Sequence, residues 1–193
     1  MVSKLALAVQ EVLWESIHKQ SDSDVIASLE KHYYEVVDGI GAHKTPKAYG
    51  AFPTDPYSHT PAGRGAQQPG MTGQVKEDIL CRWGEFGVYA HEGKLFFNPT
   101  IVRTNEYLEK QKEFEFFDVE NKKQTLTIPK HALCFTYCQV PIVYHTESNA
   151  NGIEIVLSNG EIKKIDQYHL DADDTASLFS RNGKISQINI YFS

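Results

Sequence analysis

Residues 152–165, GIEIVLSNGEIKKI, decide the fold class of the C-terminal part of this chain. Two runs of alternating apolar and polar residues flank the turn sequence Ser158-Asn159-Gly160. An Asn-Gly pair between two such runs is the strongest short-range signal of a β-hairpin. Gly160 can adopt a positive φ without steric cost, as the tight turn of such a hairpin requires. The stretch therefore predicts two antiparallel strands joined by a short turn.

Further short runs with the composition of strands lie on both sides of this hairpin. They are rich in aromatic and β-branched residues, which favour β structure. The runs are Lys94–Asn98, Phe114–Val119, Gln124–Pro129, Leu133–Tyr137, Pro141–Thr146 and the closing KISQINIYF at 184–192. Short strands at this spacing predict an antiparallel sandwich or curled sheet. One helical turn is predicted among them, at Asp173–Phe179, with Asp173 or Asp174 as its cap.

The N-terminal part of the chain has helical rather than alternating periodicity. The apolar residues that recur at helical spacing in the first segment are Leu5, Val9, Val12 or Leu13, and Ile17. A second helix is predicted from about Asp24 to Asp38, with capping residues at 21–23 and a stop at Gly39. The short connection SDSD predicts an antiparallel helical hairpin. A third helix is predicted from about Gln74 to Trp83.

The sequence therefore predicts an α+β chain, with an N-terminal α-helical segment followed by an antiparallel β-sandwich-like domain. The predicted helical segment covers residues 1–92 and includes a long polar loop at 46–73. The predicted β domain covers residues 93–193. Composition supports ordinary globular folding, because 41% of the 193 residues are hydrophobic and 23% are charged.

Charge and hydropathy argue against several classes of partner. The formal net charge is −6 and the pI is near 5.7, which argues against nucleic acid or an anionic membrane as the main partner. The sequence has no run of about 18 apolar residues, which a membrane-spanning helix needs. The N-terminal MVSKLALAVQEVLWESIHKQ is interpreted as an amphipathic helix rather than a signal peptide, because Gln10, Glu11 and Glu15 interrupt its apolar part.

Cysteine and histidine usage predicts neither disulfides nor a metal site. The three cysteines are odd in number and form no CxxC pair, which favours buried thiols and a cytoplasmic location. The eight histidines show no ligand spacing such as HxH or HExxH. His145, Glu147 and His169 could meet across strands, although such a group on a solvent-exposed face is the commoner outcome. We expect no cofactor.

The stretch 52–80 carries the candidate ligand-binding residues. Four prolines and four glycines oppose regular structure until about Gln74, and a loop of this length is usually either functional or disordered. We interpret it as a binding loop, with a structural or disordered loop as the alternative. Its hydrogen-bonding side chains include Asp55, Tyr57, His59, Thr60, Arg64, Gln67, Gln68 and Thr72.

Two positions in this loop suit an anion. The glycines on both sides of Arg64 let backbone amides and a guanidinium converge on one anion, as phosphate recognition requires. Thr72 and Gly73 precede a predicted helix, whose free N–H groups and dipole favour an anion. The alternatives are an exposed arginine in a turn, and an ordinary N-cap at Thr72.

Other residues of the loop suit a sugar. His59 could orient a sugar hydroxyl or a phosphate, or it could be a turn residue without a ligand. The amides of Gln67 and Gln68 both donate and accept, as sugar hydroxyls require. The aromatic residues that could stack on a pyranose ring, or anchor the loop instead, are Tyr49, Phe52 and Tyr57.

Acid–base catalysis has only weak candidates near the loop. A glycosidase needs two carboxylates beside the scissile bond, and Asp55 with Glu77 is the only nearby pair. An acidic residue in the first turn of a helix, such as Glu77, is also favoured by the helix dipole alone.

Three motifs in this region resemble a known family. HTPAGRGAQQPGMTG at 59–73, IL-x-x-x-GE-x-G at 79–87 and EGKLFFNP at 92–99 resemble the end of the catalytic domain in carbohydrate-active enzymes built on an (α/α)6 toroid. The likeness is greatest to cellobiose- and chitobiose-type phosphorylases. Gly63-Arg64-Gly65 and Thr72-Gly73 match that family's Gly-Arg-Gly and Thr-Gly pairs, and Leu95 and Pro99 match its exit strand. The resemblance covers about residues 55–100.

The resemblance implies a function for the chain. It implies the C-terminal segment of a glycoside hydrolase or phosphorylase, in which the helical segment is the end of a toroid. The ligand-binding residues would be His59, Arg64, Gln67, Gln68, Thr72 and Gly73. The family's general acid lies upstream of this segment, so we expect no turnover by this chain alone. Expected partners are a carbohydrate or phosphate ligand and either a second copy or an upstream toroid domain. A non-catalytic interaction or oligomerisation module is the alternative.

Overall fold

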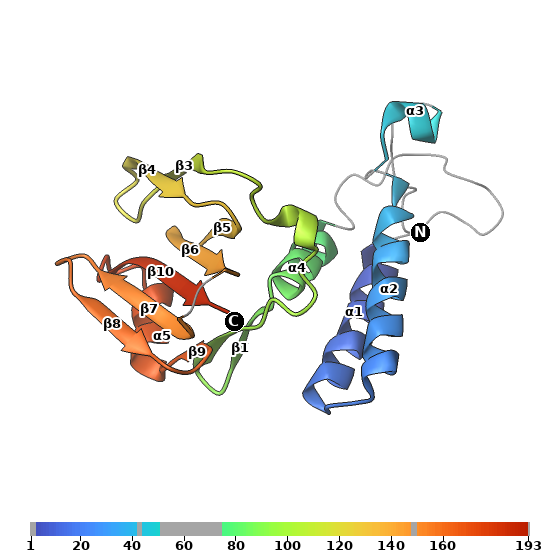
Figure 1. Cartoon of the computed structure of the whole chain (residues 1–193), viewed down its shortest axis with the longest axis horizontal. Coiled ribbons are helices and arrows are strands. Elements are labelled where there is room, and N and C mark those ends of the chain that lie inside the picture. Colours follow the sequence, from blue (N-terminus) through green and yellow to red (C-terminus); the bar gives the residue numbers. More distant parts are fainter. Residues whose placement is uncertain (1–2, 42–43, 51–74, 148–149, 193) are drawn as a thin grey trace. The chain divides into compact units, whose positions relative to one another are not determined.

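The structure is a computed structural model that describes residues 3–41, 44–50, 75–147 and 150–192. The chain is an α+β protein in which N-terminal helices are followed by antiparallel-rich β sheets (Figure 1). It divides into two compact units, Met1–Glu85 and Phe86–Ser193. The division predicted at 92/93 follows strand β1 (Val88–His91), a short run that the sequence pattern does not distinguish from a loop.

The first unit contains the helices α1 (Ser3–His18), α2 (Ser23–Asp38), α3 (Pro46–Tyr49) and α4 (Val75–Glu85). As predicted, α1 and α2 form an antiparallel hairpin, and they lie alongside each other in Figure 1. Asp22 caps α2 by accepting a 2.8 Å hydrogen bond from the backbone N–H of Asp24, and Gly39 ends the helix. α4 packs against α1.

The buried face of α1 differs from the predicted one. Leu5 and Val12, both in the predicted apolar stripe, are 42% and 49% exposed. The buried positions are Ser3, Ala6, Gln10 and Leu13. Leu13, the predicted alternative to Val12, is fully buried as expected. The prediction was wrong at Leu5, and it missed Gln10, which is satisfied inside the unit by donating a hydrogen bond to a backbone carbonyl of α4.

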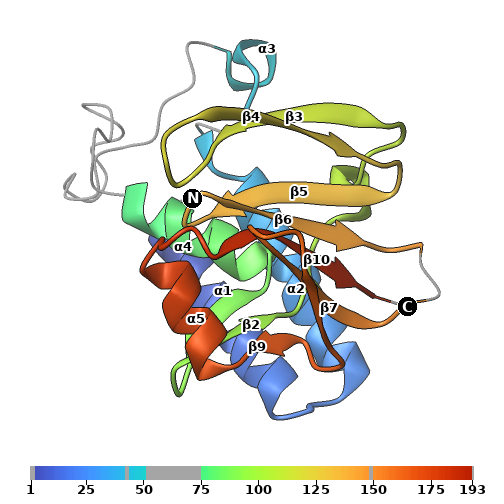
Figure 2. The same cartoon turned by 90° about the vertical axis from the view of Figure 1, so that its left-hand side faces the viewer.

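The described residues of the second unit form three sheets. A three-stranded sheet has the order β1-β2-β9, a five-stranded sheet has the order β5-β6-β10-β7-β8, and β3 and β4 form a separate hairpin. The bounds after β1 are β2 Lys94–Phe97, β3 Lys112–Phe117, β4 Lys123–Ile128, β5 Ala132–Tyr137, β6 Val140–His145, β7 Gly152–Leu157, β8 Ile162–Ile165, β9 His169–Leu170 and β10 Ile185–Tyr191. Figure 2 shows the β3–β4 hairpin beside β5.

The hairpin predicted at 152–165 is present as β7–β8. Ile153 pairs with Ile165 and Val156 with Ile162, and Gly160 in the turn has a φ of +87°. One pairing in the sheet departs from the predicted antiparallel pattern: β10 runs antiparallel to β7 but parallel to β6. Alternation of apolar residues is the same in both kinds of pair and does not reveal strand direction.

The core of the second unit covers both faces of the five-stranded sheet. The fully buried side chains that share one face are Ile142, Tyr144, Ile153, Ile155, Ile188 and Ile190. Val143 lies on the other face and packs with Ile128 and Ala132. The Tyr144 hydroxyl is satisfied because it donates a 2.7 Å hydrogen bond to the Phe86 carbonyl. Within the described part of the chain, no helix is long and apolar enough to cross a membrane.

Helix α5 (Ala172–Phe179) lies beside β2 and β9 (Figure 2). Its cap is Asp171, which accepts a 2.8 Å hydrogen bond from the Asp174 N–H, and the predicted caps Asp173 and Asp174 lie inside the first turn. All three are acidic, so composition alone did not identify the cap. The Thr175 hydroxyl accepts a 3.1 Å hydrogen bond from the backbone N–H of Leu95 and so joins α5 to β2.

Candidate functional site

The long polar loop predicted at 46–73 is wrong at its start, where Pro46–Tyr49 form the short helix α3, because Thr45 caps the helix and Pro46 suits its first position. The predicted loop from residue 51 on, which carries the candidate ligand-binding residues, lies outside the described residues. This holds for Asp55, His59, Arg64, Gln67, Gln68, Thr72 and Gly73. The structure does describe the helix that follows. α4 begins at Val75, two positions after Gly73, so the first turn of the helix is the part of the predicted site that has a geometry.

Helix α4 buries charged side chains and exposes apolar ones. Its buried positions include Glu77 and Glu85, which are 4% and 8% exposed, whereas Ile79 and Leu80 are each 53% exposed. A helix in a globular protein ordinarily buries its apolar side chains and exposes its charged ones. The interior of the first unit therefore contains carboxylates that need hydrogen-bond partners.

Glu77, the predicted acid candidate, lies in the first turn of α4. Within the described part of the chain, its Oε2 atom is buried without a hydrogen-bond partner. The nearby helix N-terminus favours a carboxylate, but burial of an unpaired polar group costs free energy. Glu77 Oε2 therefore needs a hydrogen-bond donor that is not among the described protein groups.

Glu85, at the other end of α4, is fully partnered. The Tyr33 hydroxyl donates a 2.7 Å hydrogen bond to its Oε1, and the Arg82 guanidinium donates a 2.6 Å hydrogen bond to its Oε2. Burial, and secondly the Glu85 charge, raise the pKa of Tyr33 far above its usual value, so this phenol stays protonated and donates. Glu85 thus holds α2 and α4 together.

Glu77 and Glu85 do not form a glycosidase acid pair. They are eight positions apart on one helix, which separates them by about 12 Å along its axis. The carboxylates of glycosidases lie about 5–9.5 Å apart. Asp55, the other predicted partner of Glu77, lies outside the described residues.

Cys81 lies on the same buried face of α4. Its backbone carbonyl accepts a 2.8 Å hydrogen bond from Gln10 Nε2. Burial, with a further contribution from nearby carboxylates, raises the pKa of its thiol to about 11, so it is not a thiolate nucleophile at neutral pH. A cavity of about 200 Å³ adjoins it, lined by Ala6, Tyr33, Val37, Ile40, Asp78, Cys81, Arg82 and Glu85.

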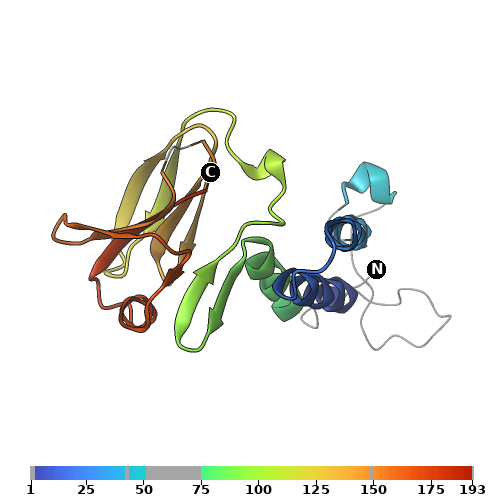
Figure 3. The same ribbon diagram turned by 60° about the horizontal axis from the view of Figure 1, so that its bottom comes forward.

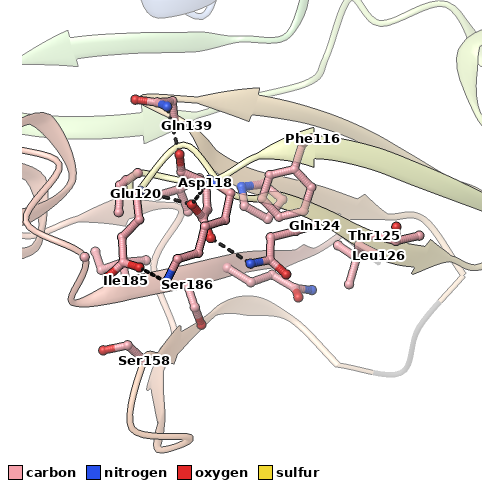
Figure 4. A pocket seen from close by; sticks show the side chains of 16 residues that line it. Phe116, Asp118, Glu120, Gln124, Thr125, Leu126, Gln139, Ser158, Ile185 and Ser186 are labelled. Carbon is pink, nitrogen blue, oxygen red and sulfur yellow. Dashed lines mark hydrogen bonds and ion pairs between the residues drawn. The ribbon is translucent and has the colours of Figure 1, made fainter.

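A hollow of about 420 Å³ lies in the second unit between the β3–β4 hairpin and the starts of β6 and β10 (Figure 4). Asp118 in its wall accepts hydrogen bonds from Gln124 Nε2 and from the backbone N–H groups of Glu120 and Lys122, at 2.7–3.0 Å. These bonds hold the pKa of Asp118 below its ordinary value. Gln139 donates to the Asp118 carbonyl at 2.8 Å. These polar groups organise the hairpin turn and therefore have a structural role.

A second hollow of this unit, of about 520 Å³, is lined largely by aromatic side chains. It includes Phe96, Asn98 and Pro99 from the strand that the resemblance singles out. Its other walls come from β1, β9 and the C-terminal end, which are far apart in sequence. Sequence reasoning missed this hollow because only the pairing of β1, β2 and β9 brings these residues together.

The histidines and acids that could have met across strands do not gather. His145 Nε2 lies 3.3 Å from Asn189 Oδ1, Glu147 lies 3.5 Å from His131, and His169 Nδ1 lies 3.2 Å from the Leu170 carbonyl. Among the residues that the structure describes, no group of three or more His, Cys, Asp or Glu side chains could hold a metal ion.

Comparison with known proteins found no relative of this chain. The sequence matches no protein-family model, and no curated protein matches it. The functional assignment therefore depends on the residues themselves.

Proposed function

We propose that this chain is the C-terminal segment of a carbohydrate-active enzyme of the glycoside hydrolase or phosphorylase type. Its loop at 59–73 and the first turn of α4 would bind a sugar or phosphate group. Two supports are the sequence likeness to toroid enzymes over residues 55–100 and the start of α4 directly after Thr72-Gly73. The observation that carries the proposal is Glu77, a buried carboxylate with an unpartnered oxygen at this helix start.

The charge of Glu77 indicates which ligand group lies next to it. A carboxylate accepts hydrogen bonds, and a sugar hydroxyl donates one. A phosphate group has little to donate at neutral pH, and its charge repels a carboxylate. Glu77 therefore favours a sugar hydroxyl at its own position. A phosphate would bind farther along the loop, at Arg64 and the Gly73 amide, where positive charge and free N–H groups are expected.

Catalysis requires groups that this segment does not supply. The two buried carboxylates of α4, Glu77 and Glu85, are too far apart along the helix to act as a glycosidase pair. The proposed enzyme therefore takes its general acid from an upstream toroid domain, and the isolated chain is inactive. The proposed location is the cytoplasm, in keeping with free thiols at Cys81, Cys134 and Cys138.

Titration calorimetry of the full chain with cellobiose, chitobiose and inorganic phosphate tests the proposal. Loss of one charged hydrogen bond corresponds to about tenfold weaker binding, so Arg64→Ala weakens phosphate binding and Glu77→Gln weakens sugar binding by about that factor. Glu92→Gln, at a carboxylate with 82% side-chain exposure, is the matched control and leaves both unchanged. Absence of heat for all three compounds at millimolar concentration contradicts the proposal.

An activity assay separates a binding segment from a complete enzyme. The isolated chain is expected to cleave no β-linked disaccharide, with or without phosphate. Measurable cleavage that Glu77→Gln abolishes would show that the chain carries its own catalytic acid and that the upstream domain is not needed.

An interaction or oligomerisation module is the second candidate, and one observation favours it. The helices of the first unit expose large apolar side chains at Leu5, Val12, Val25, Ile79 and Leu80. Soluble monomers rarely leave extensive apolar patches uncovered. Sedimentation velocity tests this candidate: self-association that Ile79→Lys and Leu80→Lys abolish supports it, and a strictly monomeric wild-type profile contradicts it.

A further inference from the structure

The aromatic hollow of the second unit has the dimensions of a small-ligand site. Its volume is about 520 Å³, within the range of about 300–1,000 Å³ that is usual for such sites. The aromatic and imidazole side chains that line it are Tyr89, Phe96, Phe97, Tyr107, Tyr168, His169 and Phe192. The β1–β2 hairpin, which supplies Tyr89, Phe96 and Phe97, is drawn in green in Figure 3.

Strand pairing places three of these rings on one face of the three-stranded sheet. Tyr89 on β1 is directly opposite Phe96 on β2, and Phe96 is directly opposite His169 on β9. The Tyr89 and Phe96 rings are stacked with centroids 5.0 Å apart and an interplanar angle of 7°, and the centroid of His169 lies 4.9 Å from that of Phe96. Directly opposite side chains in a sheet hold each other in place. The rings therefore form a preformed row.

A second stacked pair completes the aromatic lining. The rings of Tyr168 and Phe192 have centroids 5.0 Å apart and an interplanar angle of 13°. The Tyr168 hydroxyl donates a 3.2 Å hydrogen bond to the Tyr191 carbonyl, which fixes the orientation of the ring. Tyr168 is 36% exposed, so its surface is open to a ligand.

The polar groups of the hollow include both donors and acceptors. Asn98 Oδ1 accepts hydrogen bonds from the Thr100 N–H and hydroxyl, and within the described part of the chain Asn98 Nδ2 keeps its donors unused. His169 Nδ1 donates to the Leu170 carbonyl at 3.2 Å in the neutral tautomer that leaves Nε2 as an acceptor. The Tyr107 hydroxyl has no hydrogen-bond partner among the described residues, and burial raises its pKa to about 12, so it donates at neutral pH.

Among the described residues that line the hollow there is no Asp, Glu, Lys or Arg. A site for phosphate, a nucleotide or a charged peptide segment would provide opposite charge. A site for an acyl chain would not need three neutral hydrogen-bonding groups beside its aromatic faces. The ligand that suits both properties is a neutral ring with an apolar C–H face and hydroxyl groups at its edge, which describes a hexopyranose.

We propose that this hollow is a carbohydrate-binding subsite that takes one or two neutral pyranose rings. A ring packs on the aromatic faces, while Asn98 Nδ2 and the Tyr107 hydroxyl donate to sugar oxygens and His169 Nε2 accepts from a sugar hydroxyl. This subsite lies wholly in the second unit and does not depend on the loop or on Glu77. It would anchor a chain of sugars rather than act on one.

Residue-resolved NMR titration of the full chain with cellobiose tests this subsite. The expected result is saturable shifts of the amide signals of Phe96, Asn98 and His169. Tyr168→Ala weakens the affinity for cellobiose at these signals at least tenfold. Phe117→Ala, at an exposed aromatic residue of the same unit that does not line the hollow, is the matched control and changes the affinity less than twofold.

A second variant and a charged sugar complete the test. Tyr107→Phe keeps the ring and removes only the hydroxyl, and it is expected to weaken binding several-fold even if Tyr168→Ala fails to fold. Glucose 6-phosphate is expected to bind these residues at least tenfold more weakly than methyl β-glucoside. The subsite is overturned if no neutral sugar shifts these signals, if Phe117→Ala weakens binding as much as Tyr168→Ala, or if the phosphorylated sugar binds equally well. Shifts confined to residues 75–77 would support the loop site alone and exclude this one.

Discussion

Tyr33 on α2 and Glu85 on α4 are joined by a 2.7 Å hydrogen bond although 52 positions separate them in the sequence. Tyr33 is fully buried, and the other Glu85 oxygen is held by Arg82. This bond fixes α4, and with it the helix start that follows the predicted binding loop, against the helical hairpin. Helix α4 can expose its apolar residues because polar contacts of this kind hold its inner face.

Removal of the Tyr33 hydroxyl tests this role. Tyr33→Phe lowers the free energy of unfolding by about 1.5–3 kcal/mol, because it removes a hydrogen bond to a buried charged group. Urea denaturation measures the change. Glu35 is exposed and lies 3.9 Å from Lys31, so Glu35→Gln is the control and costs less than about 1 kcal/mol. Equal effects of the two substitutions would contradict the role of the Tyr33–Glu85 bond.

In the first unit, the Gln10 side chain occupies the space that a Cβ atom at Gly84 would need. A Cβ atom at Gly84 would lie 2.0 Å from Gln10 Oε1, so Gly84→Ala forces Gln10 away from the Cys81 carbonyl and costs about 1–3 kcal/mol. In a Gln10→Ala background the same change is expected to stabilise the protein by up to about 1 kcal/mol, because alanine favours a helix more than glycine does. A double-mutant cycle by urea denaturation measures both steps. The same sign in both backgrounds would contradict the contact.

Substitutions at two glycines with positive φ, Gly160 and Gly87, distinguish the cost of backbone strain from the cost of a steric clash. Gly160 has a φ of +87° and open space around it, so Gly160→Ala costs about 1–2 kcal/mol through strain alone. Gly87 has a φ of +66°, and a Cβ there would lie 1.6 Å from the Asn98 carbonyl oxygen. Gly87→Ala is therefore expected to cost about 1–3 kcal/mol more than Gly160→Ala. Thermal denaturation of both variants checks the order, and equal costs would be inconsistent with the close approach of Gly87 to Asn98.

The stability of the second unit is expected to depend on pH through His145. Burial lowers the pKa of His145 from its ordinary value of 6.5, against smaller opposing effects of Asn189 and Glu154. Its ring also stacks on Tyr191. The unfolded chain then takes up the proton first as pH falls. The contribution of neutral His145 to stability is complete above pH 6.5 and is lost as the pH falls through the lower pKa that His145 has in the folded state.

His145→Gln is expected to make the melting temperature less dependent on pH between 7.5 and 5. His32→Gln, at an exposed histidine of α2, is the control and leaves that dependence unchanged. If the His145 variant keeps the full wild-type slope, another group is responsible for it.

Local patterns predicted most elements of the fold. The Asn159-Gly160 turn, the SDSD connection and the runs of β-branched residues each depend on neighbours in sequence, which is why the hairpins and helices were found. The parallel pairing of β10 with β6 and the short strand β9 depend on contacts between distant segments. Nothing in the local sequence determines them.

Much less of the candidate sites was predictable. Glu77 was singled out as an acid at the helix start, but its burial and its unpartnered oxygen among the described groups depend on tertiary packing, which a first-turn position does not reveal. The aromatic hollow needed the register that places Tyr89, Phe96 and His169 side by side. Alternation indicates that such residues share a face, and only the pairing shows that they share a site.

A crystal structure of the full chain with bound cellobiose tests the central claim, that this segment binds carbohydrate, most directly. The account predicts a sugar hydroxyl within about 2.5–3.0 Å of Glu77 Oε2. A structure in which a protein donor occupies Glu77 Oε2, and cellobiose at saturating concentration leaves the start of α4 empty, would contradict it.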